Sequence, residues 1–198
     1  MKKVLFLGAH ADDIELGCGA TIHKHRADWQ MRAWVFSDCN PQGYPLVAAA
    51  ERALGRLGIR RVGFSGLPTR YFAEHRQLIW ESCAELARDF DPDCVFVNSD
   101  GDAHQDHRSL CEEALRKTFR CSIVSYDPVA SAHCCNTHET VAEADVAAKL
   151  EALAHYAIYR DKPYFDPEYV RARLRVSGQA ADTRYAEAFC IKRLVDGL

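Results

Sequence analysis

Short apolar runs alternate with longer amphipathic segments over most of the chain. An apolar run bounded by glycine or polar residues is typical of a buried strand in a parallel sheet, whereas apolar residues at helical spacing indicate a helix. The predicted strands are Lys3–Leu7, Met31–Phe36, Arg61–Phe64, Cys94–Val97 and Ser122–Tyr126. The predicted helices are Glu15–Arg26, Leu46–Leu57, Glu74–Phe90 and His107–Phe119. This alternation predicts an α/β fold with a mostly parallel sheet and helices on both faces.

The composition adds limits on size and partners. With 48% hydrophobic and 27% charged residues, the chain can bury one sizeable core. No repeat, linker or low-complexity segment divides residues 1–198, so we expect one domain. A formal net charge of -3 gives no reason to expect nucleic acid or a membrane surface as a partner. No apolar stretch approaches the roughly 20 residues of a membrane span, and the first apolar run is too short for a signal peptide.

The chain contains nine cysteines. Without an export signal they are interpreted as reduced thiols, and we therefore expect a cytoplasmic protein. The adjacent pair Cys134 and Cys135 does not have the spacing of a structural zinc site.

Two polar clusters follow two of the predicted strands. They contain His10, Asp12 and Asp13 after the first strand and His104, Asp106 and His107 after the fourth. Adjacent carboxylates repel each other, so the pair Asp12 and Asp13 favours a site in which a cation or a proton lies between them. In open α/β sheets, ligands bind at the carboxyl ends of the strands. We therefore expect the two clusters to meet in one site.

The residue types match a mononuclear zinc site of the hydrolytic kind, which uses three histidine or carboxylate ligands and a water. His10, Asp13 and His107 supply that number of ligands. Asp12 is then left beside the metal, where it can accept a proton from water. His104 is left on the other side, with Asp106 available to hold its ring orientation.

Other interpretations of these residues stay open at this point. Asp12 and Asp13 are also typical of a helix N-terminus, where the macrodipole favours acids, and Asp106 could be an N-cap. The glycines between Gly8 and Gly19 match a dinucleotide-binding turn poorly, because neighbouring aspartates would repel a pyrophosphate. A metallo-phosphoesterase usually holds two metals and needs more ligands than we can assign. A catalytically silent binding protein could keep the metal, but it would not need a base beside it.

The segments AHADDIELGCGA (residues 9–20) and DAHQDH (residues 102–107) resemble the two signatures of the PIG-L / LmbE-like family of zinc-dependent N-deacetylases. The similarity runs through nearly the whole chain, including the helix that contains Lys149 and the segment Tyr185–Phe189. It implies a Rossmann-like three-layer sandwich, with residues 1–198 forming a single LmbE-like deacetylase domain. The implied activity is removal of an acyl group, usually acetyl, from the nitrogen of an amino sugar. The implied cofactor is one Zn²⁺ per chain, with another divalent ion as the alternative.

The family motif also assigns a role to each residue of the two clusters. The metal ligands are His10, Asp13 and His107, the general base is Asp12, and Asp106 supports His104, which stabilises the transition state or acts as an acid. We expect His104 to be protonated and to face the developing oxyanion. Either Asp12 or His104 could protonate the leaving amine.

The chain departs from the family pattern in ways that bear mainly on the substrate. Ala9 and Ala11 replace prolines, which should loosen the loop without removing a ligand. Leu46 and Ala49 stand where many members have Arg-x-x-Glu, and Arg70 is the candidate for a substitute substrate contact. The expected partner is a small N-acylated amine, and the resemblance implies that this amine is a sugar. A non-sugar amide, the acyl group and the oligomeric state stay open, with a homo-oligomer among the options.

Overall fold

The structure is a computed structural model that describes residues 1–129 and 135–195. Its strands are β1 (Lys2–His10), β2 (Trp29–Ser37), β3 (Val62–Phe64), β4 (Cys94–Asn98), β5 (Ser122–Tyr126), β6 (Thr137–Thr140) and β7 (Ala186–Arg193). Its α-helices are α1 (Asp13–Lys24), α2 (Val47–Leu57), α3 (Arg76–Phe90), α4 (Gln105–Leu115), α5 (Glu143–Leu153) and α6 (Pro167–Ala180). Single 3₁₀ turns are η1 (Phe72–Glu74), η2 (Ala157–Tyr159) and η3 (Pro163–Phe165).

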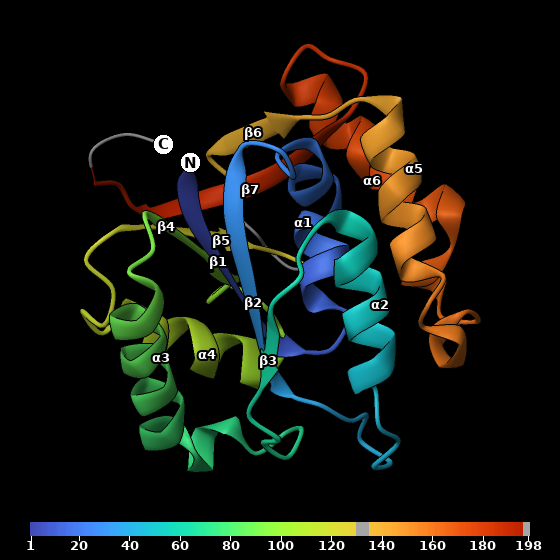
Figure 1. Cartoon of the computed structure of the whole chain (residues 1–198). Coiled ribbons are helices and arrows are strands. Elements are labelled where there is room, and N and C mark those ends of the chain that lie inside the picture. The colour runs from blue at the N-terminus through green and yellow to red at the C-terminus, as the bar shows by residue number, and fades with distance from the viewer. Residues whose placement is uncertain (130–134, 196–198) are drawn as a thin grey trace.

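The strands form one seven-stranded sheet in the order β3-β2-β1-β4-β5-β7-β6. The first five strands in the chain run parallel, whereas β7 is antiparallel to β5 and to β6. Helices α1, α2, α5 and α6 lie on one side of the sheet, and α3 and α4 lie on the other (Figure 1). These three layers confirm the predicted α/β sandwich with a mostly parallel sheet.

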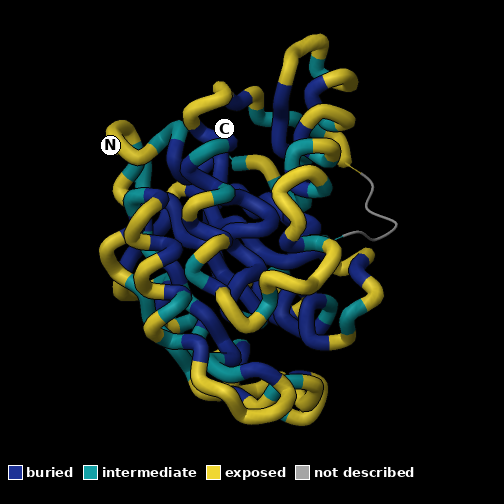
Figure 2. Tube along the Cα trace, turned by 90° about the vertical axis from the view of Figure 1, so that its right-hand side faces the viewer, coloured by how far each residue is buried: buried dark blue, intermediate teal, exposed yellow. Residues whose placement is uncertain are grey.

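Each face of the sheet buries its own apolar core, and β1 contributes to both. Successive side chains of a strand point to opposite faces. Val4 and Phe6 therefore pack in the core beneath α1, α2 and α5, whereas Leu5 and Leu7 pack in the core beneath α3 and α4. β4 and β5 are buried from end to end and β1 is buried from Val4 to Ala9, while exposed residues lie on the outside of the molecule (Figure 2). This is why β1 and β4 contain continuous apolar runs in the sequence.

The five predicted strands are all present, and Ser122–Tyr126 has the predicted bounds. The helix expected at His107–Phe119 begins earlier and ends earlier, at Gln105 and Leu115. The strand pattern did not identify β6 and β7. β7 contains a four-residue apolar run, Ala188–Ile191, which lies between the charged residues Glu187 and Lys192 and was not included among the predicted strands.

The parallel pairing of β1 with β4 brings the two polar clusters together. Val4 of β1 is paired with Cys94 of β4, so the two strands run side by side and end at the same edge of the sheet. β1 ends at His10 and β4 ends at Asn98, and each is followed by a loop that opens a helix. The predicted meeting of the two loops at one sheet edge is therefore correct.

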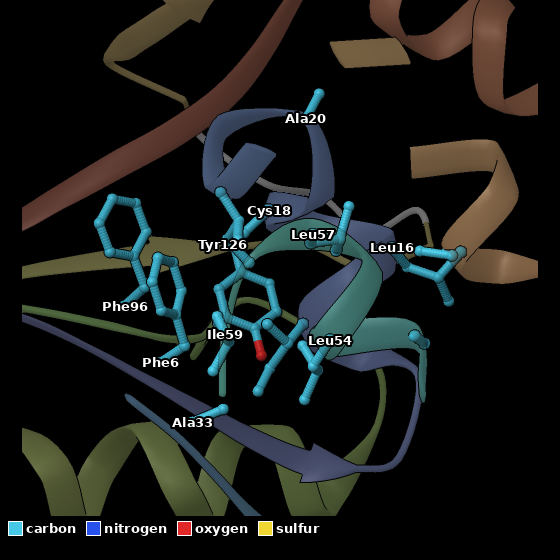
Figure 3. Close-up of a cluster of buried hydrophobic side chains, with 14 of the residues drawn as sticks. Phe6, Leu16, Cys18, Ala20, Ala33, Leu54, Leu57, Ile59, Phe96 and Tyr126 are labelled. Carbon is cyan, nitrogen blue, oxygen red and sulfur yellow. The ribbon is translucent and has the colours of Figure 1, made fainter. Parts of the chain in front are cut away.

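Helix α1 packs closely on the sheet at Gly17. A Cβ atom at this position would lie 2.1 Å from Cδ2 of Tyr126. The Tyr126 ring fills the core beside Phe6, Phe96 and Ile59 (Figure 3), and its hydroxyl donates to the carbonyl oxygen of Leu7 at 2.8 Å. Only glycine allows the helix to approach this ring.

Replacing Gly17 by alanine should therefore destabilise the fold by about 1–3 kcal/mol, as other overpacked cores do. The expected result is a lower midpoint of urea unfolding, because the Tyr126 ring must move and its hydroxyl loses the Leu7 carbonyl. The matched control is Gly55→Ala in the exposed part of α2, where a Cβ would meet nothing within 4 Å. That variant should gain about 0.5–1 kcal/mol. Equal stability of both variants would contradict the packing argument.

The cysteines in the described residues are free thiols, whereas Cys134, together with His133, lies outside those residues. Within residues 1–129 and 135–195, no helix is both long enough and apolar enough to cross a membrane.

Candidate metal centre

The first cluster is positioned by the junction between β1 and α1. His10 is the last residue of β1 and Asp13 is the first of α1. Between them, Asp12 adopts a left-handed backbone conformation, with φ 113°, which is uncommon for a residue other than glycine. The Asp12 side chain makes no capping hydrogen bond to α1. Asp12 therefore stands at the N-terminus of α1 without using its carboxylate as a cap, and backbone strain at such a position is typical of functional sites.

Three donor atoms from the two clusters converge at the sheet edge. His10 Nδ1 lies 3.2 Å from His107 Nε2. Asp13 Oδ2 lies 3.5 Å from His10 Nδ1 and 3.3 Å from His107 Nε2. Asp13 and His107 are buried, and His10 is partly exposed. The three residues that the sequence suggested as ligands therefore lie within reach of a single ion.

The spacing of these donors fits a tetrahedral zinc site. Ligand bonds of about 2.0–2.1 Å at tetrahedral angles separate the ligand atoms by about 3.3–3.4 Å. The separations of 3.2, 3.3 and 3.5 Å match this value. One ring nitrogen each from His10, His104 and His107 also lies within 4.8 Å of the others, so a three-histidine set is the alternative. All three separations in the set with Asp13 are 3.5 Å or less.

The position of Asp106 corrects one expectation. We expected its carboxylate to orient His104, but Oδ2 of Asp106 lies 3.0 Å from Nε2 of His10. The same carboxylate accepts the backbone N–H groups of Arg70 at 2.6 Å and Phe72 at 3.3 Å. Asp106 is fully buried, and only its backbone N–H reaches His104. A carboxylate that bonds to the second ring nitrogen of a metal-binding histidine fixes the tautomer and orientation of the ring. Asp106 is placed to orient His10 in this way.

Two further residues support the site, and the sequence analysis missed both. Asp102 Oδ2 lies 2.8 Å from Nδ1 of His107, which repeats the carboxylate–histidine arrangement on the second histidine. Asn98 donates from Nδ2 to Asp13 Oδ2 at 3.1 Å and accepts the backbone N–H of Ala9 at 2.9 Å. Asn98 ends β4 and Asp102 follows it in the polar segment, so the signal was their place beside the predicted cluster.

His104 caps α4, and its surroundings favour the neutral ring rather than the protonated ring that we expected. The backbone N–H of Asp106 donates to its Nδ1 at 3.2 Å, so the proton of the neutral ring resides on Nε2. Burial lowers the pKa of His104 to about 4, and the positive charges of His10 and His107 act in the same direction. His104 can therefore donate a hydrogen bond to an oxyanion from Nε2, but it is a neutral donor at neutral pH.

The two adjacent aspartates have opposite electrostatic environments. Burial raises the pKa of Asp12 well above its usual range, and the neighbouring charge of Asp13 adds to this. Burial would also raise the pKa of Asp13, but His107 and His10 outweigh it and hold that pKa well below the usual range. For His107, burial acts to lower the pKa, yet the carboxylates of Asp13 and Asp102 raise it to about 10. Neighbouring carboxyl groups with pKa values pushed apart are typical of a site that separates charge stabilisation from proton transfer.

Arg70 lies beside the site through its backbone. Its N–H donates to Asp106, and its carbonyl oxygen accepts from the side chain of Gln105. The residue is exposed and has a φ of 76°. The structure thus places Arg70 at the rim, and a contact of its side chain with substrate stays a prediction.

Cavity size does not identify this site. A cavity of about 810 Å³ lies at the opposite edge of the sheet, where it is lined by residues that include Lys2, Pro92 and Phe119. The convergence of donor atoms, rather than the size of a cavity, therefore identifies the chemistry.

Replacing Asp102 or Asp106 by asparagine should weaken metal binding about 10- to 100-fold, the range for carboxylates that orient metal-binding histidines. The measurement is competition for Zn²⁺ with a chromophoric chelator. Asp100→Asn is the matched control, because Asp100 lies in the same segment but pairs with Lys192 at the surface. If all three variants bound zinc as the unaltered chain does, neither carboxylate would orient a ligand.

Comparison with known proteins identifies the family of the chain. The family model described as PIG-L: GlcNAc-PI de-N-acetylase matches residues 5–119, which is more than half of the chain. The chain therefore belongs to the PIG-L family, and the resemblance inferred from the two motifs is confirmed. The matched region contains both polar clusters. No curated protein matches the chain.

Solved structures share the fold over nearly the full length. The conserved protein TT1542 from Thermus thermophilus is 23% identical, with a TM-score of 0.84 over 100% of this chain and 98% of its own. The N,N'-diacetylchitobiose deacetylase from Pyrococcus horikoshii is 21% identical, with a TM-score of 0.79 over 96% of this chain and 83% of its own. GalB, the 4-carboxy-2-hydroxymuconate hydratase from Pseudomonas putida, is 18% identical, with a TM-score of 0.81 over 100% of both chains. At these identities the likeness establishes the fold alone.

Proposed function

We propose that this chain is a metal-dependent N-deacetylase that removes an acetyl group from the nitrogen of an amino sugar or an amino-sugar conjugate. The main observation behind the proposal is the convergence of His10, Asp13 and His107 at tetrahedral spacing. Asp12 stands beside them, and its carboxylate makes no capping hydrogen bond to α1. Membership of the PIG-L family and the deacetylase among the solved structures of the same fold support it.

The three donors would hold one divalent ion, with Zn²⁺ favoured by the histidine and carboxylate set. Such an ion supplies a Lewis acid that polarises the amide carbonyl and makes water a better nucleophile. Asp106 and Asp102 orient the two histidines through their second ring nitrogens. Asn98 orients Asp13 by donating to its Oδ2.

Asp12 transfers protons and His104 stabilises charge during hydrolysis. Asp12 accepts a proton from the attacking water, and its raised pKa suits a general base. His104 donates a hydrogen bond from Nε2 to the oxyanion that forms from the carbonyl oxygen. The C–N bond then breaks, and Asp12 returns its proton to the amine nitrogen. The products are acetate and the free amine.

The test is an assay of acetate and free amine on zinc-loaded protein with N-acetylglucosamine, N,N'-diacetylchitobiose and a non-sugar N-acetyl amine. We expect equal amounts of acetate and amine from at least one sugar. Release only from the non-sugar amide would move the substrate to another amide class. Retained metal without release from any amide would favour a binding protein or the hydration chemistry of the hydratase that shares this fold.

A further inference from the structure

A buried ion pair, formed by residues of two other elements, contacts the middle of α1. Lys149 of α5 and Glu187 of β7 are each 3% exposed, and Lys149 Nζ lies 2.6 Å from Glu187 Oε1. Lys149 Nζ also donates to the carbonyl oxygen of Leu16 at 2.6 Å. The Glu187 carboxylate accepts the backbone N–H groups of Ala20 at 3.1 Å and Thr21 at 2.8 Å. Both charged groups therefore bond to the backbone of a helix on which neither lies.

The Leu16 carbonyl and the Ala20 N–H, which the ion pair contacts, are one helical turn apart. In a regular α-helix the N–H of residue i donates to the carbonyl of residue i−4, so Ala20 and Leu16 are standard partners. Here a chain of hydrogen bonds runs from the Leu16 carbonyl through Lys149 and Glu187 to the Ala20 N–H. Gly19 leaves room for it, because a Cβ there would lie 3.0 Å from Cγ of Lys149. Side chains that enter this ladder are a known cause of helix distortion.

The ion pair is linked to the metal centre through one turn of α1. The N–H of Leu16, whose carbonyl bonds to Lys149, donates to the carbonyl oxygen of Asp12 at 2.9 Å. Asp13 lies in the same turn and supplies one of the converging donor atoms. The position of this turn therefore sets the positions of both aspartates.

Stability alone gives little reason for this ion pair. Desolvation of two buried charges offsets much of their attraction, and apolar pairs of similar volume often replace buried ion pairs without loss of stability. An apolar pair could not bond to the backbone of α1. We propose that Lys149 and Glu187 are positioning residues that fix the first turn of α1, so that Asp12 and Asp13 are held in place at the metal centre. This inference rests on the proposed function, because it assigns the pair a role in that site.

The test compares two double variants, Lys149→Met/Glu187→Leu and the control Arg56→Gln/Glu151→Gln. The control removes an exposed ion pair between α2 and α5 whose atoms lie 2.6 Å apart. For the first double variant we expect the global unfolding midpoint to be kept and amide exchange within residues 13–19 of the metal-free protein to be faster by about tenfold or more. We also expect the Kd for Zn²⁺ to rise about 10-fold or more, the lower end of the range for residues that orient ligands. The control should change neither quantity.

Unchanged exchange and unchanged zinc affinity in the first double variant would overturn the inference. Amide exchange is measured on the metal-free protein, so it tests the ion pair even if the unaltered chain releases no acetate. Failure of this inference can therefore be distinguished from failure of the proposed function.

A second variant, Lys149→Ala, tests whether the charge of Lys149 or only the volume of its side chain is needed. A cavity of about 270 Å³ lined by Lys149, Glu187 and Gly17 gives small molecules access. Propylamine should restore zinc affinity and propanol should not, whereas equal recovery with both would also overturn the inference.

Discussion

Replacing Asp12 by asparagine should lower kcat about 10²- to 10⁴-fold, the usual effect of losing a general base, and leave the bound metal in place. This loss corresponds to about 3–5 kcal/mol in the activation barrier. Asp12 lies between β1 and α1, yet its carboxylate neither caps the helix nor contributes to the converging donors. The substitution keeps the shape of the side chain and removes only its capacity to accept a proton.

The kinetic pattern should separate Asp12 from its neighbour. Because a base acts in the transition state, the loss should fall on kcat more than on KM, and the ascending limb of the pH–rate profile should change with it. Asp13→Asn should instead lower the zinc content, because a neutral amide is a poorer ligand than a carboxylate. Asp28→Asn, in the exposed turn after α1, is the matched control for a surface aspartate. An Asp12→Asn variant without zinc, next to an active Asp13→Asn variant with zinc, would require the two roles to be exchanged.

Replacing His107 by alanine should remove most of the bound zinc and lower activity by more than about 100-fold, since even residues that only orient ligands cost up to that amount. His107 is buried, and its Nε2 lies within 3.3 Å of donor atoms on both His10 and Asp13. Its loss leaves two donors, which is too few for a catalytic zinc site. The measurement is the metal content of protein purified with limiting zinc, and His155→Ala is a control outside the site.

His104→Ala distinguishes the two possible ligand sets. If Asp13 completes the site, this variant should keep its zinc and lose only part of kcat, because it removes a hydrogen-bond donor to the oxyanion. If the three histidines hold the ion, it should lose zinc as His107→Ala does. Full zinc content in both variants would show that the metal binds elsewhere.

The sequence by itself determined the layers of the fold and the two polar clusters that form the candidate site. Apolar runs such as Val4–Leu7 are buried on both faces of a parallel sheet, and burial on both faces leaves a pattern that can be recognised locally. The polar clusters after β1 and β4 were recognisable because polar side chains at strand ends break that pattern. Since parallel strands end at one edge, their meeting followed from the fold class alone.

Only the tertiary structure decided which side chain contacts which. Asp106 precedes His107 and follows His104 closely in sequence, yet its carboxylate contacts His10 because β1 and β4 are neighbours in the sheet. The bonds from Lys149 and Glu187 to α1 likewise join segments more than a hundred residues apart. The neutral state of His104 depends on burial and on nearby charges rather than on its neighbours in sequence. Local sequence specifies backbone conformation and burial, but a side-chain contact depends on strand order and helix packing, which are properties of the whole chain.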